Sequence, residues 1–263
     1  MQSPKTTHET PNWKFSFIDD GFFDLNLNAQ KSQTAVITKQ NRFKTRIGFL
    51  AIESPPGTFL IDLGIGNYPY PLLNRSPSSP YISMQEKLKK YKIEQINGII
   101  FSHLHADHLG GYMEFKDGHF TQNFPEIPCY VNEIEWNFRL DRLNKYEDSY
   151  KTYIDHLKPN IHLTSEDEEI HPGIRIFSKG GHTPGHQTIL IEADDELIFY
   201  GGDLIATETQ LAKNRSMPYD FDHEQAKRLR EEIYSEAIKN NWIFVLNHSP
   251  HTKFSSLDKN RKK

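Results

Sequence analysis

Cysteine is nearly absent from this sequence: the 263 residues include a single one, Cys129. A chain with one thiol forms no internal disulfide and offers no thiolate cluster for a closed structural zinc site. Any metal ion held by this chain must therefore be bound by histidine and carboxylate side chains. The sequence contains 13 histidines and 35 acidic residues from which such ligands can come.

A net positive charge and long apolar runs are also lacking. The formal net charge is -4, and Lys and Arg are scattered except at the C-terminal end, so there is no electrostatic footprint for nucleic acid or an anionic membrane. No apolar stretch approaches the ~18 residues of a membrane-spanning helix, and the N-terminus lacks the features of a secretory signal. We therefore expect a soluble, cytoplasmic protein whose partner is a small molecule.

The length lies at the upper end of what one hydrophobic core supports, so we predict a single domain over residues 1–263, with residues 1–12 flexible. Interleaved strand and helix patterns favour a layered α/β fold. The expected strands cover 15–18, 34–38, 47–52, 58–63, 99–101, 129–131, 174–177, 188–191 and 197–200. The expected helices cover 84–91, 132–140, 147–157 and 223–239. The first four strands are expected to be antiparallel neighbours.

The segment His103-Leu104-His105-Ala106-Asp107-His108 follows the buried strand expected at 99–101. In extended backbone His103 and His105 project to the same side, where two imidazoles can share one metal ion. The glycines at 110–111 allow the chain to turn and direct the following Asp-His pair to the same place. Imidazole and carboxylate suit zinc and related divalent metals, so the segment predicts an open metal site.

Three further ligand candidates lie after later apolar runs. His182 sits in the glycine-rich turn at 180–186, which brings its imidazole close to other groups. Asp203 follows a buried strand and a glycine pair, and its two oxygens could bridge two cations. His248 follows the apolar run at 243–246 and is a natural ligand for a second ion, with His251 as a weaker competitor.

In this order, the motifs resemble the metal-ligand motifs of the metallo-β-lactamase superfamily, from Ile61 to about His248. The resemblance implies an αβ/βα four-layer sandwich with a dinuclear site along one edge of its two sheets. It also implies two divalent ions, with zinc as the default and manganese, iron or cobalt as alternatives. The implied ligands are His103, His105 and His182 for the first ion, and Asp107, His108 and His248 for the second, with Asp203 bridging.

The same resemblance implies a hydrolase in which a hydroxide shared by the two ions attacks the substrate. Asp107 is expected to help shuttle a proton, which makes it the candidate catalytic residue. Asp62 resembles the family's early aspartate that supports the ligands from behind. Ser102 is expected to orient an imidazole in the same way, unless it is only a turn residue.

The region before His103 and a helical insert at 136–159 resemble the branch that contains quorum-quenching lactonases and methyl parathion hydrolases. Those lactonases place a tyrosine three residues after the bridging aspartate, whereas this chain has Ala206. A small ester, lactone or related substrate is expected. The alternatives are a thioester hydrolase like glyoxalase II, and a catalytically silent domain that binds metal or a partner.

Four aromatic residues are candidates for substrate contacts: Trp136 and Phe138 in the insert, and Tyr219 and Phe221 before the last helix. Small-molecule pockets are commonly lined by such side chains. The alternative is that these aromatics only pack the helices onto the sandwich. If they are exposed, they are compatible with a homodimer.

Overall fold

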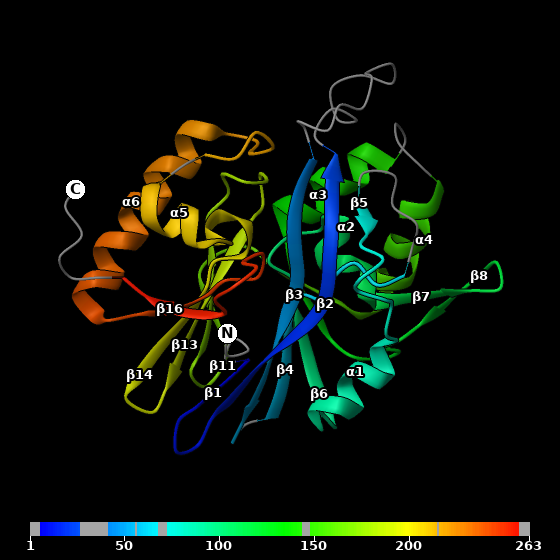
Figure 1. Ribbon diagram of the computed structural model, residues 1–263, viewed down its shortest axis with the longest axis horizontal. Helices are drawn as coiled ribbons and strands as arrows, with labels where there is room; N and C mark the ends of the chain where they lie inside the picture. The colour runs from blue at the N-terminus through cyan, green and yellow to red at the C-terminus, as the bar shows by residue number, and fades with distance from the viewer. Residues whose placement is uncertain are drawn as a thin grey trace.

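The computed structural model describes residues 6–26, 42–55, 57–67, 73–143, 148–214 and 216–257. Within them, two large sheets face each other, with helices on their outer sides (Figure 1). The helices are α1 (Met84–Tyr91), α2 (Ala106–Leu109), α3 (Glu133–Leu143), α4 (Asp148–Leu157), α5 (Glu208–Lys213) and α6 (His223–Asn240). The 3-10 turns are η2 (Gly110–Tyr112), η3 (Lys158–Asn160) and η4 (Gly202–Ile205). None of the helices in these ranges is long and apolar enough to cross a membrane.

The first sheet has the order β1-β2-β3-β4-β6-β9-β10, with β5 paired to β2, and the second has the order β11-β12-β13-β14-β15-β16. The strands of the first are β1 (Thr7–Glu9), β2 (Lys14–Asn26), β3 (Arg42–Ser54), β4 (Gly57–Ile61), β5 (Leu73–Arg75), β6 (Ile96–Ile100), β9 (Cys129–Asn132) and β10 (Ile161–Thr164). Those of the second are β11 (Glu168–His171), β12 (Ile174–Ser178), β13 (Gln187–Ala193), β14 (Glu196–Tyr200), β15 (Ile243–Val245) and β16 (Phe254–Ser256). A separate hairpin joins β7 (Met113–Lys116) to β8 (His119–Gln122).

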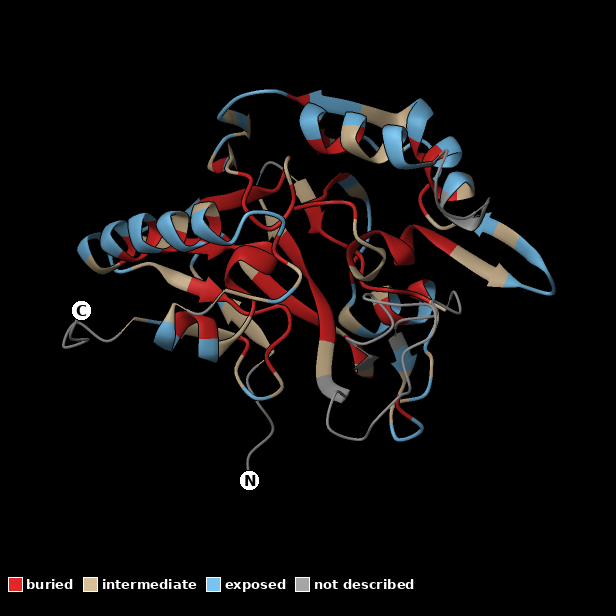
Figure 2. Ribbon diagram, turned by 90° about the horizontal axis from the view of Figure 1, so that it is seen from above, coloured by how far each residue is buried: buried red, intermediate tan, exposed pale blue. Residues whose placement is uncertain are grey.

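Three buried apolar clusters fill the spaces between the layers. The inner strands are accordingly buried along much of their length, whereas the helices are exposed in part (Figure 2). Alternation along β13 shows how one strand serves two of them: Ile189 and Ile191 join the cluster between the sheets, and Leu190 joins the cluster under α5 and α6. The third cluster lies between the first sheet and the helices α1, α3 and α4. Three interfaces make four layers, which confirms the predicted αβ/βα sandwich.

The strand pairing agrees with the sequence patterns where they can be compared. β3 and β4 are antiparallel neighbours, as predicted, and β2 pairs antiparallel with β3 directly. The predicted strand at 34–38 lies outside the described residues. β4 pairs in parallel with β6, and β14 with β15, so the carboxyl ends of the strands in each pair lie at one edge. The loops that leave this edge carry the candidate ligands.

The N-terminal segment differs from the expectation of flexibility over residues 1–12. Residues 7–9 form β1, which pairs with β2 along the edge of the first sheet. The Thr10 hydroxyl and the Asn12 backbone and side-chain amides then donate hydrogen bonds to the Asp194 carboxylate. Edge pairing and a shared acceptor therefore order residues 7–12.

The helical segment predicted at 136–159 corresponds to most of α3 and α4, and residues 144–147 lie outside the described part of the chain. β9 and β10 are parallel neighbours in register Cys129↔Ile161. A parallel pair needs a crossover, and these helices provide it. The segment is therefore part of the outer helical layer rather than an addition to the fold.

A buried lysine leads to a prediction on pH dependence. Lys253 is 1% exposed, its ammonium donates to the Ser249 carbonyl, and its Nζ lies 4.6 Å from the centre of the Phe17 ring. Burial, helped by the nearby Arg46 charge, lowers the pKa of Lys253 to about 7. In the unfolded chain a lysine holds its proton to about pH 10.4, so folding becomes more favourable as pH rises from about 7 toward 10.

The free energy of unfolding of the wild type, minus that of Lys253→Met, is therefore expected to rise by about 3 kcal/mol between pH 7 and pH 9.5. Urea denaturation at both pH values measures this difference. The exposed Lys239, changed to Met, is the matched control and should give a pH-independent difference. A flat difference for Lys253 as well would contradict the prediction.

Candidate metal centre

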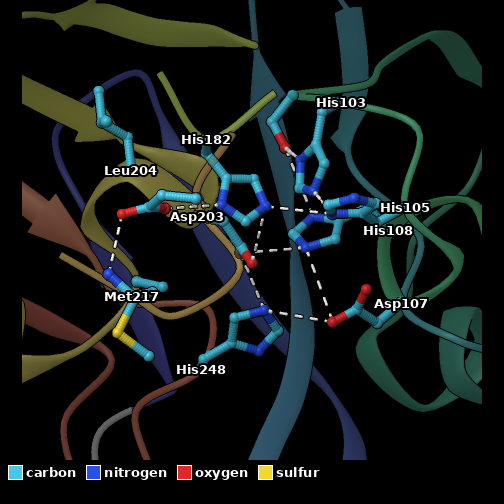
Figure 3. Close-up of polar contacts among 12 residues, drawn as sticks. His103, His105, Asp107, His108, His182, Asp203, Leu204, Met217 and His248 are labelled. Carbon is cyan, nitrogen blue, oxygen red and sulfur yellow. Dashed lines mark hydrogen bonds and ion pairs between the residues drawn. The ribbon is translucent and has the colours of Figure 1, made fainter. Parts of the chain in front are cut away.

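Three imidazoles converge on one point at the carboxyl edge, and we call His103, His105 and His182 the first donor group. His105 Nδ1 lies 2.8 Å from His103 Nε2 and 3.1 Å from His182 Nε2 (Figure 3). Three ring nitrogens this close cannot all carry protons that point at one another. Converging nitrogen lone pairs are the arrangement that a divalent cation binds.

The second donor group comprises Asp107, His108, Asp203 and His248. Asp203 Oδ1 lies 2.9 Å from His248 Nε2 and 3.1 Å from His108 Nε2, and Asp107 Oδ2 lies 3.5 Å from His248 Nε2. The other oxygen of Asp203, Oδ2, lies 3.5 Å from His182 Nε2 in the first group. Asp203 therefore directs one oxygen to each group, as expected of a bridging ligand.

Both sheets contribute to each donor group. β6 ends just before the segment 103–108, so the first sheet supplies two side chains to each group. Loops after β12, β14 and β15 supply His182, Asp203 and His248 from the second sheet. The structure thus brings together all seven predicted ligands. His186 and His251 belong to neither group.

Gly202 shapes the turn that carries the bridging aspartate. Its φ is +51°, and a Cβ atom there would lie 2.6 Å from His186 Nε2 and 2.8 Å from Ser102 Cβ. Gly202→Ala is therefore expected to displace Asp203, weaken metal binding at least about tenfold, and lower the free energy of unfolding by about 1–3 kcal/mol.

Gly118 provides the matched control for that substitution. Its φ is +81°, but a Cβ atom there meets nothing within 4 Å, so Gly118→Ala carries the backbone strain without the clash. Chelator competition for zinc and urea denaturation should be compared for the two variants. Equal effects of the two substitutions would show that Gly202 has no special role at the site.

Asp62 and Ser102 lie directly behind the ligands. The Asp62 carboxylate accepts hydrogen bonds from His108 Nδ1 at 2.7 Å, from the Ser102 amide and hydroxyl at 2.7 and 2.8 Å, and from the Tyr200 hydroxyl at 2.8 Å. Because the Ser102 hydroxyl donates to Asp62, it can accept from His103 Nδ1, 3.1 Å away. This order of donors leaves Nε2 of both histidines unprotonated and directed at the site when the rings are neutral.

Two supporting contacts were not predicted from the sequence. Asp220 Oδ1 lies 3.0 Å from His182 Nδ1, and the backbone carbonyl of Arg46 lies 3.0 Å from His248 Nδ1. Burial alone would raise the pKa of Asp220, but hydrogen bonds from His182 and Met217 and the charge of Arg230 lower it. The only sequence signal was an aspartate shortly before a helix, and a backbone carbonyl leaves no signal at all.

The pKa shifts differ between the histidines of the two groups. Burial lowers the pKa of His103 and His105 well below the usual value, so both imidazoles stay neutral and keep a lone pair for a cation. Burial opposes the charged form of His108 and His248 too, but the neighbouring carboxylates, Asp203 among them, raise the pKa of both. A cation bound by the second group would therefore displace protons.

The predicted substrate residues have different surroundings. Trp136 is 5% exposed and belongs to the apolar cluster beneath α3, so it packs this helix onto the sheet, and its predicted contact with substrate stays a prediction. Tyr219 stands edge-on to the His182 ring, with ring centres 5.5 Å apart. Phe138 and Phe221 contact each other at 5.5 Å between ring centres, and Phe221 is 59% exposed.

Comparisons with known proteins agree with this geometry. The family model described as the metallo-beta-lactamase superfamily matches residues 50–236. An N-acyl homoserine lactonase from Bacillus thuringiensis is 31% identical over 154 residues, which cover 56% of this chain and 54% of the lactonase. The chain thus spans about half the length of the curated relatives it matches.

Two solved structures resemble the whole fold. A probable metal-dependent hydrolase from Staphylococcus aureus superimposes with a TM-score of 0.77 at 19% identity, covering 97% of this chain and 96% of the other. The dizinc quorum-quenching lactonase AidC, in complex with a product, gives a TM-score of 0.75 at 18% identity, with 97% and 93% covered. With the family model matching most of its length, this chain belongs to the metallo-β-lactamase superfamily.

Proposed function

We propose that this protein is a dinuclear metal-dependent hydrolase of a small ester or lactone. The observation that carries the proposal is the pair of donor groups joined by Asp203, which directs one oxygen to each. The donor set of imidazole nitrogens and carboxylate oxygens fits two zinc ions or similar divalent cations. Ions bound there would supply Lewis acidity, which makes water nucleophilic near neutral pH and polarises a carbonyl.

Asp107 is the proposed proton carrier. Its side chain is 20% exposed, so it is the ligand candidate most open to solvent in its group, and its Oδ2 lies 3.5 Å from His248 Nε2. In hydrolysis, water adds to the acyl carbon and the bond to the leaving oxygen breaks. Asp107 can take the proton released by the water and deliver it to that oxygen, which leaves as a hydroxyl group.

Tyr219 is the proposed contact to the substrate carbonyl. Burial raises the pKa of Tyr219, and the carboxylates of Asp203 and Asp107 raise it further, so the phenol stays protonated and can donate a hydrogen bond. Its hydroxyl makes no hydrogen bond within the described part of the chain. Ala206 leaves only a methyl group at the position of the lactonase tyrosine, and Tyr219, whose ring centre lies 5.5 Å from that of His182, is the phenol proposed in its place. Phe138 and Phe221 would form an apolar rim.

The test is turnover of a substrate panel by zinc-loaded protein before and after chelation. The panel contains an N-acyl homoserine lactone, an aryl ester, S-acylglutathione and an aryl phosphotriester. We expect hydrolysis of the lactone or the ester that chelation removes and zinc restores. A preference for S-acylglutathione would favour a thioester hydrolase, and bound metal without hydrolysis of any substrate would favour the silent metal-binding domain.

Metal identity, oligomeric state and cellular location stay predictions. Elemental analysis of protein purified without added metal tests whether zinc is the natural ion. Light scattering during size-exclusion chromatography tests the homodimer. Fractionation of the source cells tests a cytoplasmic location.

A further inference from the structure

We propose that Asp220, held in place by Arg230, is a positioning residue that sets the metal affinity of the first donor group. The inference rests on the proposed function, since it requires that each donor group binds an ion. It assigns a role to two buried charged residues that lie outside the ligand set.

The contact to the ligand is direct. Asp220 Oδ1 lies 3.0 Å from His182 Nδ1, and both side chains are fully buried. A carboxylate at Nδ1 fixes the proton on that nitrogen and leaves the lone pair on Nε2, which faces His105. The same contact fixes the rotation of the imidazole ring, so Nε2 cannot turn away from the site.

Asp220 is itself held from two sides. Its second oxygen, Oδ2, accepts hydrogen bonds from Arg230 Nη2 at 2.9 Å and from the Met217 amide at 2.8 Å. Arg230 is fully buried on α6, and its Nε also donates to the Leu204 carbonyl at 2.6 Å. Leu204 follows the bridging Asp203 in the chain, so one guanidinium connects the support of His182 to the turn that carries the bridging ligand.

Backbone hydrogen bonds attach the same segment to the ligand loop. The Phe221 amide donates to the His182 carbonyl at 3.0 Å, and the Asp222 amide donates to the Gly181 carbonyl at 2.9 Å. Asp220 therefore cannot move away from His182 without breaking several buried contacts. Removing one partner of the buried Asp220–Arg230 pair would leave the other charge buried without a counter-charge, which destabilises the fold strongly.

A histidine of the second donor group is also supported from behind by a carboxylate that is not a ligand. Asp62 accepts from His108 Nδ1 at 2.7 Å, so each group contains one histidine backed by a separate aspartate. Loss of a carboxylate behind a metal-binding histidine typically lowers metal affinity 10–100-fold. Substitution of Asp220 should therefore lower the affinity for one ion and leave the affinity for the other unchanged. A general structural role of Asp220 would change both affinities.

The experiment is a zinc titration of purified protein against a chromophoric chelator, which resolves two dissociation constants in the wild type. Asp220→Asn is expected to raise one of them 10–100-fold and to change the other less than about threefold. Arg230→Lys keeps the charge but cannot reach both Asp220 and the Leu204 carbonyl, so a smaller loss at the same ion is expected. The absorption spectrum of the cobalt-substituted protein reports whether coordination at one ion has changed.

Asp222→Asn is the matched control. Asp222 is also an aspartate and lies two residues from Asp220, where its side chain caps α6 by accepting a hydrogen bond from the Gln225 amide. Asparagine caps a helix equally well, so the substitution should leave this contact intact. Neither dissociation constant should change in this variant. In a His182→Ala background, in which the first donor group lacks the ligand that Asp220 holds, Asp220→Asn should change neither dissociation constant further.

The outcomes separate the two proposals. A wild type that binds fewer than two ions would overturn the proposed dinuclear function. A wild type that binds two ions, with Asp220→Asn weakening both equally or neither, would overturn the role of Asp220 alone. Urea denaturation of the metal-free variants shows whether a loss of affinity comes from a loss of fold.

Discussion

Replacing Asp203 with alanine is expected to reduce hydrolysis by roughly 10³-fold or more, to the level of the chelated protein. Asp203 directs one oxygen to each donor group, so its loss leaves both ions short of a ligand and removes the charge that separates them. His103→Ala should have a similar effect through the first group alone. Both variants should remain soluble, because these side chains line the site rather than the apolar clusters.

Turnover of the best panel substrate and zinc content measured together test this expectation. Asp195→Ala is the matched control, because Asp195 is an exposed aspartate in the turn before β14. Its turnover should equal that of the wild type. If Asp203→Ala kept two ions and full turnover, the proposed site would be refuted.

Asp20→Asn is expected to lower the free energy of unfolding by about 3–5 kcal/mol, the largest stability effect that we predict. The buried Asp20 Oδ1 lies 2.6 Å from the Lys87 ammonium and 3.2 Å from Arg75 Nη2. Its Oδ2 accepts from the amides of Ile65 and Gly66 at 2.7 and 3.0 Å. An asparagine would leave the buried Lys87 ammonium and the half-buried Arg75 guanidinium without a counter-charge, and would turn one acceptor into a donor.

Urea denaturation of the metal-free protein measures this loss. Asp24→Asn, also on β2, is the control, since the Asp24 side chain has no ion pair among the described residues. A loss below about 1 kcal/mol for Asp20→Asn would contradict the prediction. Activity should be measured in the same variants, because the loop at 62–67 that Asp20 holds also bonds to the ligand segment: the Leu63 amide donates to the His108 carbonyl.

Features set by neighbouring residues were predictable from the sequence. The bounds of α1 match the prediction because Ser83 and Glu86 form a reciprocal cap at its start and Lys92 adopts a left-handed conformation at its end. The ligands were predictable for a related reason. The ligands come after the apolar strands β6, β12, β14 and β15, whose carboxyl ends lie at one edge of the two sheets.

Features that depend on distant packing were not predictable. Asp220 lies 38 residues from His182 in the chain, and no spacing rule connects them. Trp136 looked like a substrate contact because aromatic residues serve both cores and pockets, and only the packing of α3 shows that it belongs to a core. Phe138, two residues after Trp136 and therefore on another side of α3, is only half-buried.

Each donor group draws ligands from both sheets, so ions bound as proposed would act as cross-links between the two halves of the chain. At a free concentration 100 times its dissociation constant, each ion would add about 2.7 kcal/mol to the free energy of unfolding. A molecule deprived of metal would then lose stability as well as catalytic activity. It would open more readily where the sheets meet, and metal supply would govern how long the protein survives proteolysis.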